Sequence, residues 1–439
     1  MLTYKETLDY IYNLNIYGIK LGLQNITLLL SLLGNPHKEF KIIHIAGTNG
    51  KGSTAAMISF ILQAQGFKVG LYTSPHLVDF AERMKINYQS IEEEKIGELL
   101  KRVMPYIEKV AHTPGYSHPT FFEVITAMAF LYFYNEKVDF LVLEVGLGGR
   151  LDATNVCQPL ISVITKIDYD HMDKLGSNLT EIAREKGGII KSEGIVITSK
   201  QNDEAYSEIR KISIENKCRI FSVGKEINYE ILKSDIKGSL FNLKGIYSEF
   251  KNLYIPLLGR HQVNNAATAV AAIEALRIKK IKISKRAIIE GLEKVKWEGR
   301  LEIIQNNPLL ILDGAHNPNG IRVVREALED IFFHNRLILV LGIFSDKDYK
   351  QMIQIISPIA DLLITTKAQN PRATPPQIIA QEAAQYLSQD KIMITDDVPE
   401  AINLALQNSC EGDLICITGS LYTVGEAKNY FKRKDHMIS

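Results

Sequence analysis

Short apolar runs recur along the chain, and each ends in glycine or in polar residues. In the first two thirds of the chain these runs are rich in β-branched residues and occupy positions 42–46, 69–73, 140–145, 161–167 and 195–199. Runs of this length and composition are typical of buried parallel strands. The stretches between them place apolar residues at helical spacing, as in 55–65 and 91–134. The alternation predicts an α/β fold with a mostly parallel sheet.

A second α/β rhythm begins after a boundary near 295–300, which contains the single tryptophan, Trp297. Five further apolar runs follow, at 309–312, 337–341, 362–365, 392–395 and 414–418. Strands that alternate with helices in this way predict a smaller, doubly wound domain. We therefore expect one domain over 1–296 and a Rossmann-like domain over 297–439. The more irregular stretch 200–256 is expected to add strands to the first.

The apolar run at 42–46 breaks into the sequence GTNGKGS, which has the composition of a phosphate-binding loop. Gly47, Gly50 and Gly52 allow a tight loop whose backbone N–H groups face an anion. Lys51 adds a positive charge for the terminal phosphates of a nucleotide. The sequence therefore predicts a P-loop-type ATPase domain.

Two features of this loop qualify the pattern. The match to G-x-x-x-x-G-K-[ST] is imperfect, because Ile45 stands five residues before Gly50 and Gly52 separates Lys51 from Ser53. We expect Ser53 and Thr54 to cap the helix that follows, so that its positive end faces the same anion. A plain glycine turn between a strand and a helix is the alternative interpretation.

Composition and charge narrow the setting in which the chain works. The 439 residues are long enough for two or three domains, and 46% of them are apolar. The net charge of +1 comes without a basic block, so no nucleic-acid partner is expected. Four scattered cysteines favour a reducing cytoplasm. The start of the chain lacks the pattern of a signal peptide, and the apolar segment 26–33 is too short to span a membrane.

Several polar residues stand where parallel strands end, which is where ligands of such sheets gather. Ser74 follows the run at 69–73, Glu144 lies near the end of 140–145, and His171 follows 161–167. A buried carboxylate such as Glu144 is costly unless it has a partner, for example a metal ion. The alternatives are a Ser-Pro turn at Ser74, a structural role for His171, and a simple surface lysine at Lys186.

A set of motifs then occurs in one order along nearly the whole chain: GTNGKGS, TSPHL, TFFE, LEVGLGGRLDATN, DYDHMDKLG, EKGGIIK, NNAATA, WEGRLE, DGAHNP and TGSLYTVGE. This set resembles the Mur ligase superfamily, and within it the bifunctional dihydrofolate synthases/folylpolyglutamate synthases. The resemblance implies a monomeric ATP- and Mg²⁺-dependent ligase that acts through an acyl phosphate. Its implied substrates are L-glutamate with dihydropteroate, and with tetrahydrofolate or its one-carbon derivatives.

The resemblance also implies the roles of particular residues. It assigns ATP binding to Thr48, Asn49, Gly50, Lys51, Gly52, Ser53, Asn265, Arg300 and Asp313. It assigns magnesium to Ser53, Ser74, Glu144 and His171, although histidine is an unusual ligand for this hard cation. It makes Lys51, Lys186 and His316 catalytic, with Lys186 carbamylated so that it presents a carboxylate. It assigns the pteroate substrate to Thr120, Phe121, Phe122, Glu123, Leu151, Asp152 and Ala153, with an early loop around 13–16.

Two of the substrate residues have a physical rationale. Phe122 offers a flat face on which a pterin ring can stack, and Asp152 offers an acceptor for the ring's N–H donors. An ordinary core aromatic is the alternative for Phe122.

Two other classes of protein were weighed against this interpretation. Other Mur-type ligases usually carry an additional amino-terminal domain, for which a loop beginning at residue 47 leaves little room. A P-loop switch protein that binds a nucleotide without ligation does not account for the motifs around Arg300 and Asp313.

Overall fold

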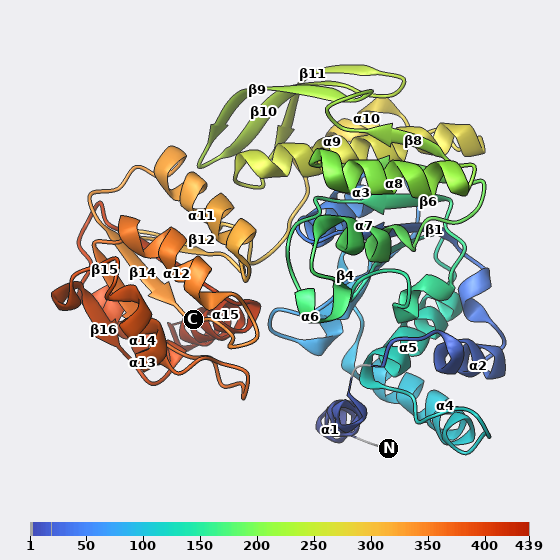
Figure 1. The fold of residues 1–439 in the computed structure, drawn as a ribbon, viewed down its shortest axis with the longest axis horizontal. Coiled ribbons are helices and arrows are strands. Elements are labelled where there is room, and N and C mark those ends of the chain that lie inside the picture. The colour runs from blue at the N-terminus through green and yellow to red at the C-terminus, as the bar shows by residue number, and fades with distance from the viewer. Residues whose placement is uncertain (1–2, 19, 439) are drawn as a thin grey trace.

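The structure, a computed structural model, describes residues 3–18 and 20–438, which form two lobes joined near residue 297 (Figure 1). The larger lobe is built on an eight-stranded sheet of order β4-β3-β2-β5-β1-β6-β7-β8. In this order the strands β2, β5, β1, β6, β7 and β8 run parallel to one another, whereas β3 and β4 pair antiparallel at one edge. The strands are β1 (Lys41–Ala46), β2 (Val69–Tyr72), β3 (Met84–Ile86), β4 (Gln89–Ser90), β5 (Phe140–Glu144), β6 (Ile161–Ile164), β7 (Ile195–Thr198) and β8 (Arg219–Ser222).

Helices cover both faces of this sheet because its strands are apolar on both sides. One core packs three of them against the sheet: α3 (Lys51–Ala64), α9 (Arg260–Ala275) and α10 (Lys285–Glu293). The other face carries α1 (Tyr4–Asn13), α2 (Gln24–Leu32), α4 (Glu93–Ala111), α5 (Phe121–Asn135), α7 (Leu179–Gly187) and α8 (Asp203–Glu215), with the short α6 (Met172–Leu175) beside them. The stretch 91–134, which was expected to be largely helical, forms α4 and α5.

A separate three-stranded antiparallel sheet packs on α9 at one end of the larger lobe (Figure 1). Its strands are β9 (Asn228–Asp235), β10 (Gly238–Lys244) and β11 (Glu249–Ile255). They supply the additional strands expected within 200–256.

The smaller lobe has a six-stranded sheet of order β12-β13-β17-β14-β15-β16. Its strands are β12 (Glu302–Asn306), β13 (Leu309–Leu312), β14 (Leu337–Leu341), β15 (Leu362–Thr365), β16 (Ile392–Ile394) and β17 (Leu414–Thr418). Its two faces are covered by α11 (Pro318–Asp330), α12 (Tyr349–Ile356) and α13 (Pro376–Ala383), and by α14 (Val398–Gln407) and α15 (Leu421–Ile438). The predicted mixed α/β class is confirmed in both lobes.

The structure corrects the sequence predictions in two places. Helix α3 already begins at Lys51 after Gly50, so Ser53 and Thr54 lie in its first turn and do not cap it. With Gly50 at the cap position, the helix starts three residues earlier than a cap at Ser53 would place it. The edge strand β12 was not expected, because its sequence EIIQN mixes polar and apolar residues and its neighbour β13 runs antiparallel to it.

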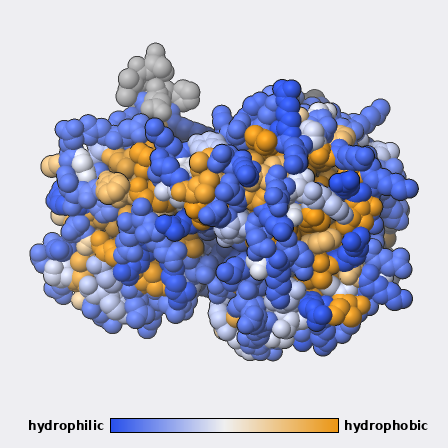
Figure 2. Space-filling model, turned by 90° about the horizontal axis from the view of Figure 1, so that it is seen from above, coloured by the Kyte–Doolittle hydropathy of each residue, from blue (hydrophilic) through white to orange (hydrophobic). Residues whose placement is uncertain are grey.

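From above, the surface shows the two lobes as distinct masses with mostly hydrophilic residues between apolar patches (Figure 2). Over residues 3–18 and 20–438, no helix has both the length and the apolar character needed to cross a bilayer.

Candidate active site

The loop between β1 and α3 forms a cradle at the N-terminal end of α3. Gly47 and Gly50 have φ angles of +150° and +86°, where glycine is favoured. A Cβ atom on Gly50 would lie 2.4 Å from Asn265 Oδ1 on α9, so the Asn265 side chain would have to shift. Because Gly50 has no side chain to cap α3, the first N–H groups of the helix are left for an anion. The helix dipole favours the same charge.

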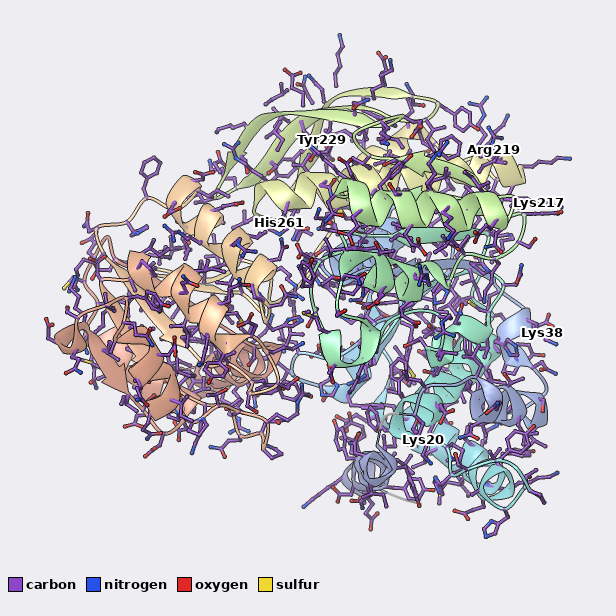
Figure 3. The ribbon with its side chains drawn as sticks, in the orientation of Figure 1. Lys20, Lys38, Lys217, Arg219, Tyr229 and His261 are labelled. Carbon is purple, nitrogen blue, oxygen red and sulfur yellow. The ribbon has the colours of Figure 1, made fainter. Side chains whose placement is uncertain are left out.

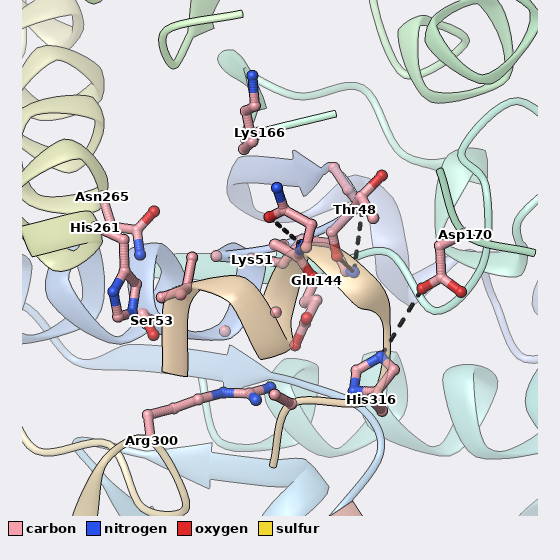
Figure 4. A pocket seen from close by; sticks show the side chains of 18 of the residues that line it. Thr48, Lys51, Ser53, Glu144, Lys166, Asp170, His261, Asn265, Arg300 and His316 are labelled. Carbon is pink, nitrogen blue, oxygen red and sulfur yellow. Dashed lines mark hydrogen bonds and ion pairs between the residues drawn. The ribbon is translucent and has the colours of Figure 1, made fainter. Parts of the chain in front are cut away.

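A cavity of about 570 Å³ opens over this loop between the two lobes (Figure 4). Every residue that the sequence analysis assigned to ATP, magnesium or catalysis lines it: Thr48, Asn49, Gly50, Lys51, Gly52, Ser53, Ser74, Glu144, His171, Lys186, Asn265, Arg300, Asp313 and His316. Tyr229 of β9 and His261 of α9 line it on the side of the three-stranded sheet (Figure 3). The structure brings these residues together, and their individual roles stay predictions.

Two lysines converge on one carbonyl at the floor of this cavity. Lys51 Nζ donates to Gly47 O at 3.1 Å, and Lys186 Nζ donates to the same oxygen at 2.9 Å. Lys186 is only 4% exposed, so it is not a surface lysine. Burial, helped by the nearby Lys51 charge, lowers the pKa of Lys186 to about 7. A substantial fraction of its amine is therefore neutral near pH 7.

Glu144 presents a buried carboxylate at the carboxyl end of β5. Its Oε2 accepts a hydrogen bond from Ser74 N at 3.2 Å. Among the described residues it has no ion-pair partner within 4.0 Å. Burial raises the pKa of Glu144 to about 7, an effect that Lys51 and Arg300 partly offset. An unpaired buried carboxylate in a cavity that Ser53 and Ser74 also line suits a hard cation such as Mg²⁺.

Arg300, Asp313 and His316 reach the cavity from the smaller lobe. Both carboxylate oxygens of Asp313 are already engaged, since they accept from Leu301 N at 2.9 Å and from Ala315 N at 2.8 Å. Burial raises the pKa of Asp313, and the Arg300 charge acts against this. The Nδ1 atom of His316 lies 3.0 Å from Gly314 O, which makes Nδ1 the donor, and its Nε2 atom lies 3.8 Å from Asp170 Oδ2 (Figure 4). Burial lowers the pKa of His316 to about 4, so the ring is neutral at pH 7.

Sequence analysis missed the polar contact that joins the lobes at this cavity. Asp170, on the loop after β6, accepts from Lys347 Nζ at 2.7 Å and from Asn317 Nδ2 at 3.3 Å. The Asp170 and Lys347 side chains are each 8% exposed. Although burial opposes it, the Lys347 charge holds the pKa of Asp170 well below its usual range. The acidic motif DYDHMD was a visible signal for Asp170, whereas Lys347 lies in a distant loop.

The arrangement of His171 qualifies its assignment as a magnesium ligand. His171 has a φ angle of +49°, which is strained for a residue other than glycine. Its Nε2 atom lies 3.1 Å from Lys347 Nζ, so the imidazole accepts from that ammonium group. In the described residues no cluster of three or more His, Cys, Asp or Glu side chains suits a metal ion. The carboxylate of Glu144 is therefore the stronger candidate ligand.

A second cavity, of about 280 Å³, lies within the larger lobe and meets the first. Residues shared by both are Ser74, Pro75, Gly146 and Leu147. The second cavity is lined by all of the residues assigned to the pteroate substrate: Thr120, Phe121, Phe122, Glu123, Leu151, Asp152 and Ala153. From the early loop, Asn15 also lines it.

Several of these residues already serve the local fold. Thr120 and Glu123 form a capping box on α5, in which Glu123 Oε2 accepts from Thr120 N at 2.8 Å. Asp152 Oδ2 accepts from Leu147 N at 2.9 Å. Phe122 packs over Gly146, where a Cβ atom would lie 2.4 Å from the ring. The fold therefore fixes this wall of the cavity.

Arg83 is a further lining residue that sequence analysis missed. It is 5% exposed, and its Nε donates to His76 Nδ1 at 2.9 Å. Its guanidinium lies 5.5 Å from the centre of the Phe121 ring. Among the described residues it takes part in no ion pair within 4.0 Å. A buried cation without a paired anion suits an acidic ligand.

A glycine-rich phosphate cradle, a buried carboxylate for a cation and a site completed by a second lobe define a class: nucleotide-dependent ligases of the phosphate-loop type. Family models agree with that assignment. The model described as "Mur ligase middle domain" matches residues 45–273, and "Mur ligase, glutamate ligase domain" matches residues 299–421. The chain belongs to the Mur ligase family and, within it, to the ATP-dependent dihydrofolate synthase/folylpolyglutamate synthase group.

Individual relatives support the narrower group. A dihydrofolate synthase/folylpolyglutamate synthase of Bacillus subtilis is 36% identical, with 98% of this chain and 99% of the relative covered. The folylpolyglutamate synthase of Mycobacterium tuberculosis complexed with ADP superposes with a TM-score of 0.91 at 30% identity, covering 98% and 99% of the two chains. Escherichia coli FolC in complex with DHPP and ADP gives a TM-score of 0.89 at 29% identity, with 99% of each chain covered.

Proposed function

We propose that this ligase joins L-glutamate to the carboxylate of dihydropteroate and of tetrahydrofolate or its one-carbon derivatives, with ATP as the second substrate. The observation that carries this proposal is the junction of the two cavities at Ser74 and Gly146. An aromatic acid whose flat ring fills the second cavity can present its carboxylate at this junction, next to the phosphate loop. The relatives named above, which include FolC with DHPP and ADP, support this choice of substrate.

The chemistry proceeds in two balanced steps. A carboxylate oxygen attacks the γ-phosphorus of ATP, which breaks the bond to ADP and gives an acyl phosphate. The amine of glutamate then attacks the acyl carbon, forms the amide and expels phosphate. Before this attack the ammonium group of glutamate must lose a proton. His316, which lines the cavity from the smaller lobe, would contact glutamate or phosphate.

The first cavity supplies the charge that these steps need. The uncapped start of α3, with Gly50 and Lys51, would hold the phosphates, and Arg300 would reach them from the smaller lobe. Glu144, Ser53 and Ser74 would hold Mg²⁺, and His171 would join them once Lys347 leaves its Nε2. When bound, the metal would neutralise charge on the transferring phosphoryl group.

Carbamylation of Lys186 is part of the proposal. Addition of CO₂ to a neutral amine forms an N–C bond and releases one proton, so the lowered pKa of Lys186 favours the reaction. The product is a carboxylate among cations, which removes the repulsion between Lys186 and Lys51 or a metal ion.

The second cavity would position the acid substrate. Phe122 would stack on the pterin, and Asp152 would accept from its N–H groups. The unpaired guanidinium of Arg83 would neutralise a substrate carboxylate. Thr120 and Glu123 would then shape the wall by holding α5.

The domain limits 1–296 and 297–439, a monomeric state and a cytoplasmic location complete the proposal, without a nucleic-acid or membrane partner. The four cysteines, at positions 157, 218, 410 and 416, are all unpaired, which is in keeping with a reducing compartment.

One assay tests the function directly. The purified protein receives ATP, Mg²⁺ and L-glutamate with either dihydropteroate or tetrahydrofolate, and phosphate release and product mass are measured. We expect phosphate release that depends on both glutamate and the pterin acid, with a product heavier by one glutamyl residue. Nucleotide hydrolysis that ignores glutamate would instead indicate a P-loop switch protein, and would overturn the proposal.

A further inference from the structure

A histidine lies at the centre of the large sheet, beneath the second cavity. His44 is the fourth residue of β1, pairs with Leu143 of β5 and Ser162 of β6, and is 0% exposed. Its side chain points to the face opposite that of Ile43 and Ile45, because side chains alternate along a strand. An apolar residue at this position would avoid the cost of burying a polar ring. The ring is therefore expected to have specific partners.

Those partners form one continuous row of hydrogen bonds. His44 Nε2 lies 2.8 Å from Thr154 Oγ1, and His44 Nδ1 lies 3.6 Å from Cys157 Sγ. Thr154 Oγ1 donates to Asp152 Oδ1 at 2.5 Å. Asp152 is one of the residues that line the second cavity.

The direction of these hydrogen bonds follows from the chemistry of the four groups. A carboxylate only accepts, so the Thr154 hydroxyl spends its single proton on Asp152. That hydroxyl must therefore accept from His44, which fixes the N–H on Nε2. The Nδ1 atom is then an acceptor for the Cys157 S–H group. Donors thus run in one sense, from Cys157 through His44 and Thr154 to Asp152, and we call these four residues the donor chain.

We propose that His44 is a positioning residue for substrate recognition, which acts through Thr154 to hold the Asp152 carboxylate as an acceptor for the N–H groups of a flat heterocycle. This inference rests on the proposed function, because it deepens the role of the second cavity. Neither His44 nor Thr154 lines that cavity, whereas Asp152, which accepts from Thr154, does.

The titration of His44 and Cys157 fits this geometry, whereas burial raises the pKa of Asp152, an effect that the hydrogen bonds from Thr154 and Leu147 act against. Burial lowers the pKa of His44 to about 3, so the ring carries one proton at pH 7 and has one donor and one acceptor nitrogen. Burial raises the pKa of Cys157 to about 12, so the thiol keeps its proton. The charge of Lys191 also lowers the pKa of His44, and at Cys157 it acts against the rise in pKa that burial causes. Lys191 Nζ donates to Asn155 O at 3.0 Å.

Two substitutions at one position separate the donor chain from simple packing. The amide nitrogen of Gln matches the place of Nε2, and that of Asn matches the place of Nδ1. His44→Gln therefore keeps the donor to Thr154, whereas His44→Asn loses it. By titration calorimetry, we expect His44→Asn to weaken dihydropteroate binding about three- to tenfold, the effect of one hydrogen bond, and His44→Gln to stay within about twofold of wild type. The affinity for ATP should not change in either variant.

Substitutions at Thr154 test the same chain from its other side. Thr154→Val keeps the shape and removes the hydroxyl, and we expect it to weaken dihydropteroate binding as His44→Asn does. Because both act on one chain, the double variant should be no weaker than the weaker single variant. Thr154→Ser, which keeps the hydroxyl, should bind dihydropteroate as wild type does. His37→Asn is a matched control, since His37 is another buried histidine, packed on Phe130 away from both cavities.

The outcomes are distinct. Three results would each overturn the donor chain: fully additive losses of affinity in the double variant, equal losses of affinity for dihydropteroate and ATP, or unchanged dihydropteroate binding in Thr154→Val. The last result decides the matter even if a His44 variant fails to fold. A wild-type protein that binds dihydropteroate without forming product would overturn the proposed function, while the calorimetric comparison would still decide the role of His44. A wild-type protein that does not bind dihydropteroate would overturn both.

Discussion

The two cavities that meet at Ser74 are built in different ways. The larger is lined by residues from 47 to 421 and closes only where the two lobes meet. The smaller is lined by residues from 15 to 153, all within the larger lobe. Charged and amide side chains dominate the first, whereas Phe121, Phe122 and Leu151 contribute to the second. Binding of the acid substrate therefore needs one lobe, and its activation needs both.

This difference separates recognition from chemistry. The second cavity contains no residue of the smaller lobe, whereas Arg300 and His316 line the first cavity from that lobe. Closure of the two lobes over the first cavity would keep water from an acyl phosphate, which would otherwise hydrolyse. Variants of the first cavity should thus lower turnover, and variants of the second should weaken substrate binding.

The largest effect is expected at Lys186. Lys186→Ala removes either the ammonium group or the carbamate from the floor of the first cavity, and we expect turnover to fall about 10³-fold. Dihydropteroate affinity should not change. Wild-type activity should rise with added bicarbonate, and the intact mass should show one bound CO₂. Unchanged turnover in Lys186→Ala, with and without bicarbonate, would exclude this role.

Arg300 tests whether the smaller lobe takes part in the chemistry. Arg300→Ala removes a cation that faces Glu144 and Asp313, and turnover should fall about 10²-fold. The dissociation constant for dihydropteroate should stay at the wild-type value, because the second cavity contains no residue of this lobe. Arg322→Ala on α11 is the matched control. Weaker dihydropteroate binding in Arg300→Ala would break the distinction between the two cavities.

The contact between Asp170 and Lys347 tests closure itself. Lys347→Ala leaves a buried carboxylate without its ion pair, which costs about 3 kcal/mol in favour of the open arrangement. We expect a larger radius of gyration in small-angle X-ray scattering and a turnover reduced about 10²-fold. Lys350→Ala, an exposed lysine on the same segment, should leave both unchanged. An unchanged radius in Lys347→Ala would mean that other contacts hold the lobes.

The sequence was most informative where one residue type has few alternatives. Gly50 needs glycine for its φ angle of +86°, and the runs at 309–312 and 337–341 coincide with β13 and β14 because buried parallel strands are continuously apolar. The cap at Ser53 was wrong because the helix uses glycine instead.

Contacts between distant segments were beyond the sequence. Lys347 lies 177 residues from Asp170, and their pairing depends on how the lobes meet. Arg83, at the end of the short 3₁₀ helix Phe80–Arg83, was also missed, since its sequence context gives no sign that it is buried without a carboxylate. Asp152 was found through a motif, but its link to His44, 108 residues away across β1, required coordinates.

Phe122 tests the recognition side of the comparison. Phe122→Ala removes the flat face of the second cavity, and we expect the KM for dihydropteroate to rise about tenfold with little change in kcat. The KM of Phe122→Leu, which keeps apolar volume without a ring face, should lie between those of wild type and Phe122→Ala. The KM for ATP should not respond. A lower kcat with an unchanged KM would show that Phe122 is only a core residue.

The smallest effect concerns His44 and the pH dependence of the protein's stability. The pKa of His44 is lowered to about 3 in the folded state, against about 6.5 in the unfolded chain. Between these values the unfolded state binds more protons, so stability is lost as the pH falls below about 6.5. The linkage amounts to about 1 kcal/mol at pH 6 and grows toward pH 3. The melting temperature of His44→Gln, which does not titrate at this position, should therefore fall less than that of wild type between pH 7 and pH 5 in a buffer-matched thermal scan.

The control is His37→Asn, which removes a histidine whose pKa is lowered to about 4 and should give a similar gain without touching the donor chain. Equal pH dependence in wild type and His44→Gln would show that the pKa of His44 is not lowered in the folded state, which would contradict the buried neutral ring on which the donor chain depends.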